Sequence, residues 1–146
     1  MNATGGPRPA ISDDEILRCF EVMAELRPQL RREDFLPTVR QMQREGYQLA
    51  CLEEHGNVVA VAGYRISHSF FLGRSLFIDD LVTAAATRGR SHGARLLDWL
   101  RDQARAAGCT VVHLESGTQR ERAHKFYFTQ GFTINAFHFQ QRLDDA

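Results

Sequence analysis

The chain has 146 residues, with eighteen basic side chains, eighteen acidic side chains and a formal net charge of zero. A chain of this length is typical of one domain and can bury about two thirds of its unfolded-state surface. The neutral balance excludes a general attraction to nucleic acid or to an anionic membrane, so neither is expected as a partner.

Residues 1–10 contain glycines and prolines and lack the apolar core of a signal peptide. We expect them to form a flexible lead-in to a single domain over residues 11–146. No apolar run approaches the roughly 20 residues that cross a bilayer. The three cysteines are widely spaced and form no C-x-x-C pair, which favours a cytoplasmic protein without a metal site.

Two helices are predicted next. Ser12, followed by a glutamate three residues later, forms a capping box that begins a helix, and Pro28 ends it. Apolar residues at helical spacing over 35–42 predict a second helix that ends at Gly46. Pro37 must then lie in the first turn of this helix, where a missing N–H is tolerated.

The pattern then changes to strands. Residues 47–54 and 57–66 are β-rich and are separated by His55-Gly56, which predicts a hairpin. Residues 75–82 carry apolar side chains on both faces, as expected for a central strand covered on each side.

A glycine-bearing turn over residues 88–97 leads into the strongest helical stripe of the chain, which ends at Gly108. Residues 110–114 form a short apolar strand. The order of strand, turn, helix and strand over residues 75–114 predicts a β-α-β unit with a parallel pair of strands.

The C-terminal part contains one more helix. Thr118 and Glu121 form a second capping box, and Gly131 is the expected end of the helix. Apolar and polar residues then alternate, which predicts one or two strands after Phe132. Such a strand could also pair across a homodimer.

The turn is suited to binding an anion. Its small residues let the backbone approach a ligand closely, and the free N–H groups at the start of the helix attract phosphate. The pattern Arg88-x-x-Ser91-x-Gly93-Ala94 resembles the acetyl-CoA signature of the GNAT superfamily of N-acetyltransferases, with Ser91 where a glycine is usual. The resemblance implies that the turn binds acetyl-CoA. The cofactor-binding residues of the turn are then Arg88, Gly89, Arg90, Ser91, His92, Gly93 and Ala94.

Three further features add to the resemblance. Asp79 and Asp80 end a central strand, as in many GNAT enzymes, and the run from Ala123 to Phe132 resembles the family's late motif, which contains Tyr127. The order of elements also matches. The resemblance implies a single-domain α/β fold with a mixed central sheet of about six or seven strands, about four helices, and strands that splay at the cofactor site.

The resemblance also implies an activity, the transfer of an acetyl group from acetyl-CoA to a primary amine of a small molecule or peptide by direct transfer in a ternary complex. The expected cofactor contacts outside the turn are Leu81, Val82, Thr83, Arg120 and Tyr127. Arg120 stands where many relatives carry asparagine, and an arginine there could reach a phosphate.

The reaction needs a neutral amine, a donor to the developing oxyanion and a proton for the departing thiolate. Asp79 or Asp80 can serve as the base, because desolvation among apolar neighbours raises the pKa of a carboxyl group. We expect the two side chains to point to opposite faces of the strand. The resemblance implies that the first residue of such an acidic pair is the base, which favours Asp79. Tyr127 can donate a proton to the thiolate, whose conjugate thiol has a pKa near ~8.5 against ~10 for tyrosine.

Each of these features has a plainer interpretation. The turn could be a simple connection, Asp79 and Asp80 could form ion pairs with arginines, and Tyr127 could be a core aromatic. The chain could also be a noncatalytic acyl-CoA-binding sensor or regulatory module. A DNA-binding protein built on the early helices is a weaker alternative because the net charge is zero.

Overall fold

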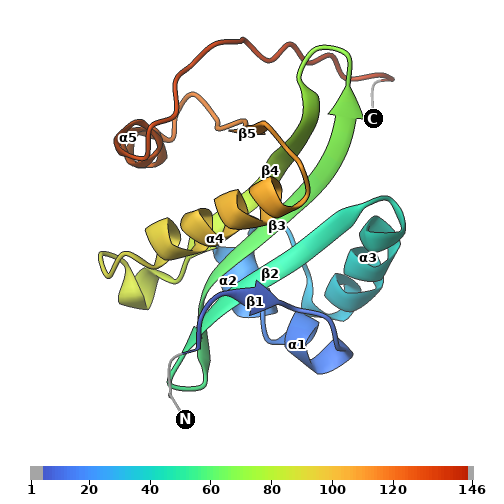
Figure 1. Ribbon diagram of the computed structural model, residues 1–146. Helices are drawn as coiled ribbons and strands as arrows, with labels where there is room; N and C mark the ends of the chain where they lie inside the picture. The colour runs from blue at the N-terminus through green and yellow to red at the C-terminus, as the bar shows by residue number, and fades with distance from the viewer. Residues whose placement is uncertain (1–4, 145–146) are drawn as a thin grey trace. The chain divides into compact units, whose positions relative to one another are not determined.

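The computed structural model describes residues 5–144, which divide after Leu114 into two compact units. The larger unit contains the sheet and most of the helices, and the smaller one contains the last helix (Figure 1). Residues 1–4 of the predicted lead-in and residues 145–146 of the predicted domain lie outside the described part. Within the described residues, no helix is long and apolar enough to span a membrane.

The capping box at Ser12 is confirmed: its hydroxyl accepts from the N–H of Glu15, and the Glu15 carboxylate accepts from the N–H of Ser12. The predicted first helix is divided in two by a turn at residues 18–19. The helices of this region are α1 (Asp13–Leu17), α2 (Phe20–Leu26) and α3 (Arg32–Arg44).

Helix α3 begins earlier than its apolar pattern indicates. It starts at Arg32, so Pro37 lies inside the helix and not in its first turn as expected. The N-terminal residues of α3 are polar, and the apolar pattern therefore does not mark this end. Phe35 and Val39 are buried and attach the helix to the core.

The sheet has the order β1-β2-β3-β4-β5, with antiparallel pairs except for the parallel pair β4–β5. The prediction of a flexible lead-in is wrong at residues 8–9. Arg8 and Pro9 pair with Cys51 and Ala50 and form a short edge strand. The strands are β1 (Arg8–Pro9), β2 (Tyr47–Glu54), β3 (Asn57–Ser69), β4 (Gly73–Thr83) and β5 (Val111–Leu114).

The hairpin and the β-α-β unit are both confirmed. His55 and Gly56 have φ values of 54° and 82° between β2 and β3, the left-handed region that a tight two-residue hairpin turn requires. Helix α4 (His92–Ala106) connects the parallel strands β4 and β5.

Helices cover both faces of the sheet. Leu49, Cys51 and Val61 share a buried cluster with residues of α1, α2 and α3. Tyr64, whose side chain alternates to the other face, packs its ring edge-on against Trp99 of α4 at 6.2 Å. The sheet is therefore the middle layer, with α4 on the opposite face from the N-terminal helices (Figure 1).

The smaller unit contains α5 (Glu121–Thr129). The capping box predicted at Thr118 is wrong, because the helix begins at Glu121 with Arg120 as its N-cap. Residues 132–144 contain no strand in the described structure, so the sheet has five described strands and not six or seven. Alternation marks residues able to form a strand, but a strand also needs a partner edge.

Candidate functional site

A bulge in β4 brings the two carboxylates together. Gly63 of β3 pairs with Asp80, but Tyr64 pairs with Ile78, so Asp79 is an extra residue without a partner on β3. An extra residue interrupts the alternation of side chains. The expectation that the two aspartates point to opposite faces is therefore wrong, and both approach Tyr47 and its neighbour Arg65 on one face.

Asp80 accepts hydrogen bonds on both of its oxygens. Arg27, at the end of α2, donates from Nε to Oδ1 at 3.0 Å, and Tyr47 donates from its hydroxyl to Oδ2 at 2.9 Å. The guanidinium also donates from Nη2 to the carbonyl of Asp79 at 2.9 Å. The Asp80 side chain is only 12% exposed, so these donors supply the stabilisation that water gives to a free carboxylate.

Asp79 has a different environment. Its Oδ2 accepts from Nε of Arg65 at 3.1 Å, while its side chain keeps 27% of its exposure. Burial raises the pKa of Asp79 above its ordinary value, and the Arg65 charge opposes this shift only in part. Asp79 is therefore a better proton acceptor near neutral pH than an exposed aspartate.

Tyr47 links the two carboxylate environments. The Arg65 guanidinium lies 5.4 Å from the centre of the Tyr47 ring, and the Tyr47 hydroxyl donates to Asp80. Burial, followed by the charge of Asp80, raises the pKa of Tyr47 and keeps its hydroxyl protonated.

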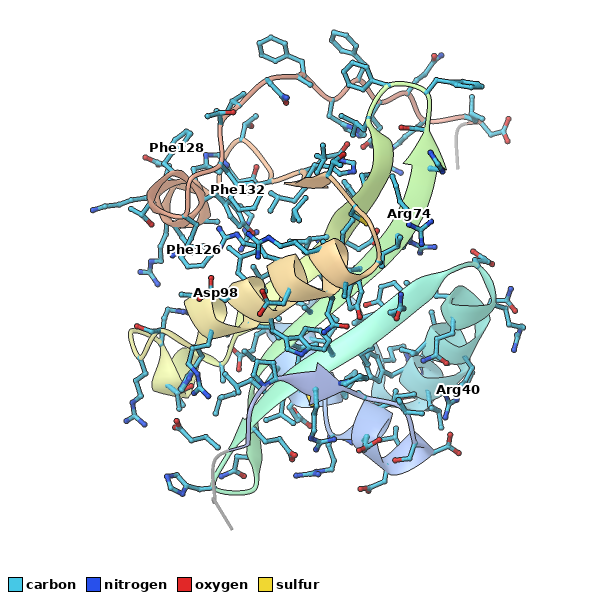
Figure 2. The ribbon with its side chains drawn as sticks, in the orientation of Figure 1. Arg40, Arg74, Asp98, Phe126, Phe128 and Phe132 are labelled. Atoms are coloured by element: carbon cyan, nitrogen blue, oxygen red, sulfur yellow. The ribbon has the colours of Figure 1, made fainter. Side chains whose placement is uncertain are left out.

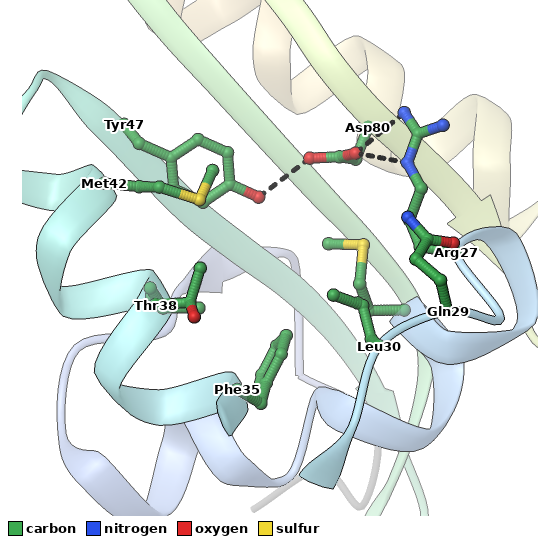
Figure 3. Close-up of a pocket in the computed structure, with 10 residues that line it drawn as sticks. Arg27, Gln29, Leu30, Phe35, Thr38, Met42, Tyr47 and Asp80 are labelled. Atoms are coloured by element: carbon green, nitrogen blue, oxygen red, sulfur yellow. Dashed lines mark hydrogen bonds and ion pairs between the residues drawn. The ribbon is translucent and has the colours of Figure 1, made fainter. Parts of the chain in front are cut away.

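Asp80 also lines a cavity of about 200 Å³ on the side of the sheet covered by α2 and α3. Figure 3 shows Asp80 at the polar end of this cavity, between Arg27 and Tyr47, with Phe35, Leu30 and Met42 on the remaining wall. The structure thus places a carboxylate at the end of a mainly apolar pocket.

The predicted anion-binding turn follows β4. A single 3-10 turn, Ala85–Thr87, precedes the exposed residues Arg88, Gly89 and Arg90, and Gly89 has a φ of 91°. Ser91 then adopts a left-handed conformation with φ 63° and makes no side-chain hydrogen bond to α4. The first N–H groups of α4, at His92, Gly93 and Ala94, are those that a helix leaves without an internal acceptor.

His92 differs from the rest of the turn because its side chain is 2% exposed. Neither ring nitrogen has a hydrogen-bond partner, although Nε2 lies 3.6 Å from Oε1 of Glu54 at the end of β2. Arg90 approaches the same carboxylate at 3.9 Å. The His92 ring therefore packs beneath the turn, and its backbone is the part available to a ligand.

The parallel strands separate just before the turn. In the described residues the β4–β5 ladder ends at the pair Ile78–Leu114, while β4 continues to Thr83. Leu81, Val82 and Thr83 remain paired with β3. Their second edge has no paired strand in the described residues, and this unpaired edge is where the splay of a cofactor site is expected.

The two remaining predicted residues belong to the smaller unit. Arg120 is the N-cap of α5, and Tyr127 lies in the last turn of that helix, two residues before its end at Thr129. Tyr127 is half-buried between the rings of Phe126 and Phe132, at 5.5 and 5.7 Å, while Phe126 and Phe128 project to different sides of α5 (Figure 2). That Arg120 and Tyr127 approach Asp79 or the turn stays a prediction.

The sequence did not single out Arg27, Tyr47 or Arg65 as site residues. Tyr47 and Arg65 face each other across β2 and β3, and Arg65 faces Phe77 of β4. Only the strand register, which is a property of the folded sheet, brings these side chains to the aspartates. The described residues contain no group of three or more His, Cys, Asp or Glu side chains that could hold a metal ion.

Residues 14–132 of the chain match the acetyltransferase (GNAT) family. An uncharacterized N-acetyltransferase of Bacillus subtilis strain 168, YhdJ, is 39% identical over 132 residues, which cover 89% of this chain and 93% of that protein.

A second relative is an aminoalkylphosphonate N-acetyltransferase of Salmonella typhimurium strain LT2. It is 31% identical over 101 residues, which cover 66% of this chain and 62% of that protein. Among solved structures, a transcriptional regulator from Bacillus halodurans C-125 superposes with a TM-score of 0.83, covering 96% of this chain and 99% of that one. Its 18% identity means that this similarity supports the fold alone.

Proposed function

Since the chain belongs to the GNAT family of N-acetyltransferases, we propose that it moves an acetyl group from acetyl-CoA to a primary amine by direct transfer in a ternary complex. The observation that supports this most strongly is the pair Asp79 and Asp80 at a bulge in β4, on the strand that leads to the anion-binding turn. One strand thus carries the candidate base and leads to the candidate cofactor site.

The turn fits the pyrophosphate of acetyl-CoA. Gly89, Gly93 and Ala94 are small, and the start of α4 offers N–H groups and the positive end of the helix dipole. Arg88 and Arg90 are exposed beside it. When bound, acetyl-CoA supplies an activated acetyl thioester, and the unpaired edge of β4 at Leu81, Val82 and Thr83 is suited to hold the pantetheine and polarise the carbonyl.

The acceptor must react as a neutral amine. A lysine-like amine has a pKa near ~10.4, so deprotonation at pH 7 costs about 4.6 kcal/mol without assistance. Asp79, whose pKa is raised by burial, accepts this proton directly or through one water. Asp80 lies in the cavity wall and positions the amino group, because hydrogen bonds from Arg27 and Tyr47 hold its carboxylate in place.

The transfer forms a bond between the amine nitrogen and the acetyl carbon and breaks the carbon–sulfur bond. The ammonium nitrogen loses two protons in all: Asp79 takes the first, which frees the amine, and the second restores Tyr127 after its phenol has donated a proton to the departing thiolate sulfur. We propose Arg120, the N-cap of α5, as a further contact to a phosphate of the cofactor.

The test is release of free thiol from acetyl-CoA in the presence of a mixed panel of amines, amino acids, aminoglycosides and peptides. We expect thiol release that requires both acetyl-CoA and an amine, and initial rates that fit a ternary-complex pattern. Tight acetyl-CoA binding without thiol release from any amine would instead identify a noncatalytic sensor. A ping-pong pattern would exclude direct transfer.

A further inference from the structure

The cavity beside Asp80 differs in character along its length. Its near end contains the Asp80 carboxylate together with Arg27 and Tyr47, and the rest of its wall is mainly apolar, with Gln29 and Thr38 as the other polar lining residues (Figure 3). The apolar wall is formed by Met23, Leu30, Phe35, Val39 and Met42. The cavity therefore offers a polar contact at one end and a surface for carbon atoms elsewhere.

The charged groups of the cavity already bind each other. Arg27 and Asp80 are its two charged lining residues, and they form an ion pair at 2.9 Å. Arg27 also gives its Nη2 to the carbonyl of Asp79, so two of its three nitrogens, Nε and Nη2, are engaged with β4. An acceptor with a phosphonate or carboxylate would find no other cation in the lining, and an acceptor with a second ammonium would find no other carboxylate.

The size of the cavity limits the apolar part of the acceptor. An apolar cavity of about 150 Å³ in another protein binds benzene. A volume of about 200 Å³ is therefore suited to one ring or to a short alkyl chain. Burying such a group is favourable because each buried methylene contributes a favourable transfer free energy.

We propose that the acceptor is an apolar monoamine, with its amino group at Asp80 and an aryl or short alkyl body in the cavity. This inference rests on the proposed function. The relative from Salmonella typhimurium is named for aminoalkylphosphonates, so 2-aminoethylphosphonate is the sharpest competing acceptor. The two acceptors differ in the charge at the end remote from the amine.

The first experiment measures kcat/KM by thiol release for n-propylamine, n-butylamine, n-pentylamine, n-hexylamine and phenethylamine, beside spermidine and 2-aminoethylphosphonate. We expect kcat/KM to rise about threefold to fourfold with each added methylene until the cavity is filled. Spermidine and 2-aminoethylphosphonate should be at least about tenfold poorer than n-hexylamine. A flat alkyl series, or a preference for either polar amine, would overturn the inference.

Calorimetry separates this inference from the proposed function. We expect n-hexylamine to bind the protein in the presence of coenzyme A with a negative heat-capacity change, the signature of apolar burial. If n-hexylamine binds but no amine releases thiol, the proposed function fails while the binding preference stands. If thiol is released but n-hexylamine does not bind, the acceptor assignment fails alone.

A variant at the edge of the cavity connects the preference to this site. Thr38 is an exposed residue of α3 that lines the cavity, so Thr38→Trp should fill part of it without disturbing the core. We expect kcat/KM for n-hexylamine to fall about tenfold or more, with n-propylamine changed less than about threefold. Gln41→Trp, at an exposed position of α3 outside the lining, is the matched control. Equal effects of both variants on both amines would overturn the assignment of the cavity.

Discussion

The Tyr47 hydroxyl donates to Oδ2 of Asp80 at 2.9 Å, across the space left by the missing side chain of Gly63. Gly63 faces Asp80 in the register of β3 and β4. A Cβ at Gly63 would overlap the Tyr47 hydroxyl and would lie 2.6 Å from the Asp80 oxygen. The glycine is thus required by the close approach of two other side chains.

Gly63→Ala should therefore both destabilise the protein and impair the site. We expect a loss of about 1–3 kcal/mol in the free energy of unfolding, as is usual for overpacking, because Tyr47 or the backbone must move. Urea denaturation measures this loss. Gly6→Ala is the control, since a Cβ there meets nothing within 4 Å, and equal stability of the two variants would contradict the packing seen at Gly63.

Tyr47→Phe removes one donor to Asp80 and keeps the ring. We expect the free energy of unfolding to fall by about 1–2 kcal/mol, because Asp80 is left with an unsatisfied oxygen in a half-buried place. KM for the amine should rise more than kcat falls, since Asp80 is proposed to position the amino group. Tyr64→Phe is the control, because the Tyr64 oxygen lies 3.4 Å from its partner on Gln48, and a larger effect there would contradict this role of Tyr47.

Asp79→Asn tests the proposed base. Burial raises the pKa of Asp79, so wild-type kcat/KM should fall as the pH is lowered through that raised pKa, where the carboxylate is lost. The variant should be about tenfold or more slower on the plateau and should lose this acidic limb. The effect of pH on stability has the opposite direction. Protonated Asp79 stabilises the fold below the pKa of the unfolded chain, and this contribution is lost as the pH rises through the raised pKa of the folded protein.

The control for this experiment is Asp98→Asn, a change of the same chemistry at an exposed position of α4. It should leave both the rate and the pH profile unchanged. A wild-type profile in Asp79→Asn would show that another group accepts the proton.

The sequence predicted those parts of the fold whose signals are local. The Ser12 capping box, the His55-Gly56 hairpin and the β-α-β unit each depend on residues close together in the chain. The Arg27–Asp80 hydrogen bond joins residues 53 positions apart, and no local pattern indicates it. The bulge at Asp79 is a matter of strand register, which the alternation of side chains cannot supply.

Some errors at the ends of elements share a cause. Arg8 and Pro9 have a composition typical of a loop, and their strand exists because β2 offers an edge with which they pair. The alternating residues after Phe132 were expected to form strands, but alternation does not identify a partner. Pairing partners are a tertiary property, so edge strands are the elements that the sequence predicts least well.

Ser91→Gly tests the departure of the turn from the family signature. Ser91 has a φ of 63°, where a side chain costs about 1–2 kcal/mol and glycine does not. Part of this gain is offset by the greater freedom of glycine in the unfolded chain, so we expect a stabilisation of up to about 1 kcal/mol. Thermal denaturation measures it. Ser91→Val should destabilise the protein by more than about 1 kcal/mol, and a neutral Ser91→Val would contradict the left-handed conformation.

Tyr127→Phe tests the proposed acid. We expect kcat to fall about tenfold or more, with little change in the Kd for acetyl-CoA, because the phenol acts on the departing thiolate and not on binding. Steady-state thiol release measures kcat, and calorimetry measures the Kd. The chain has three tyrosines, and Tyr64→Phe, on the face of the sheet that packs against α4, is the matched control. A wild-type kcat in Tyr127→Phe would return Tyr127 to a packing role between Phe126 and Phe132.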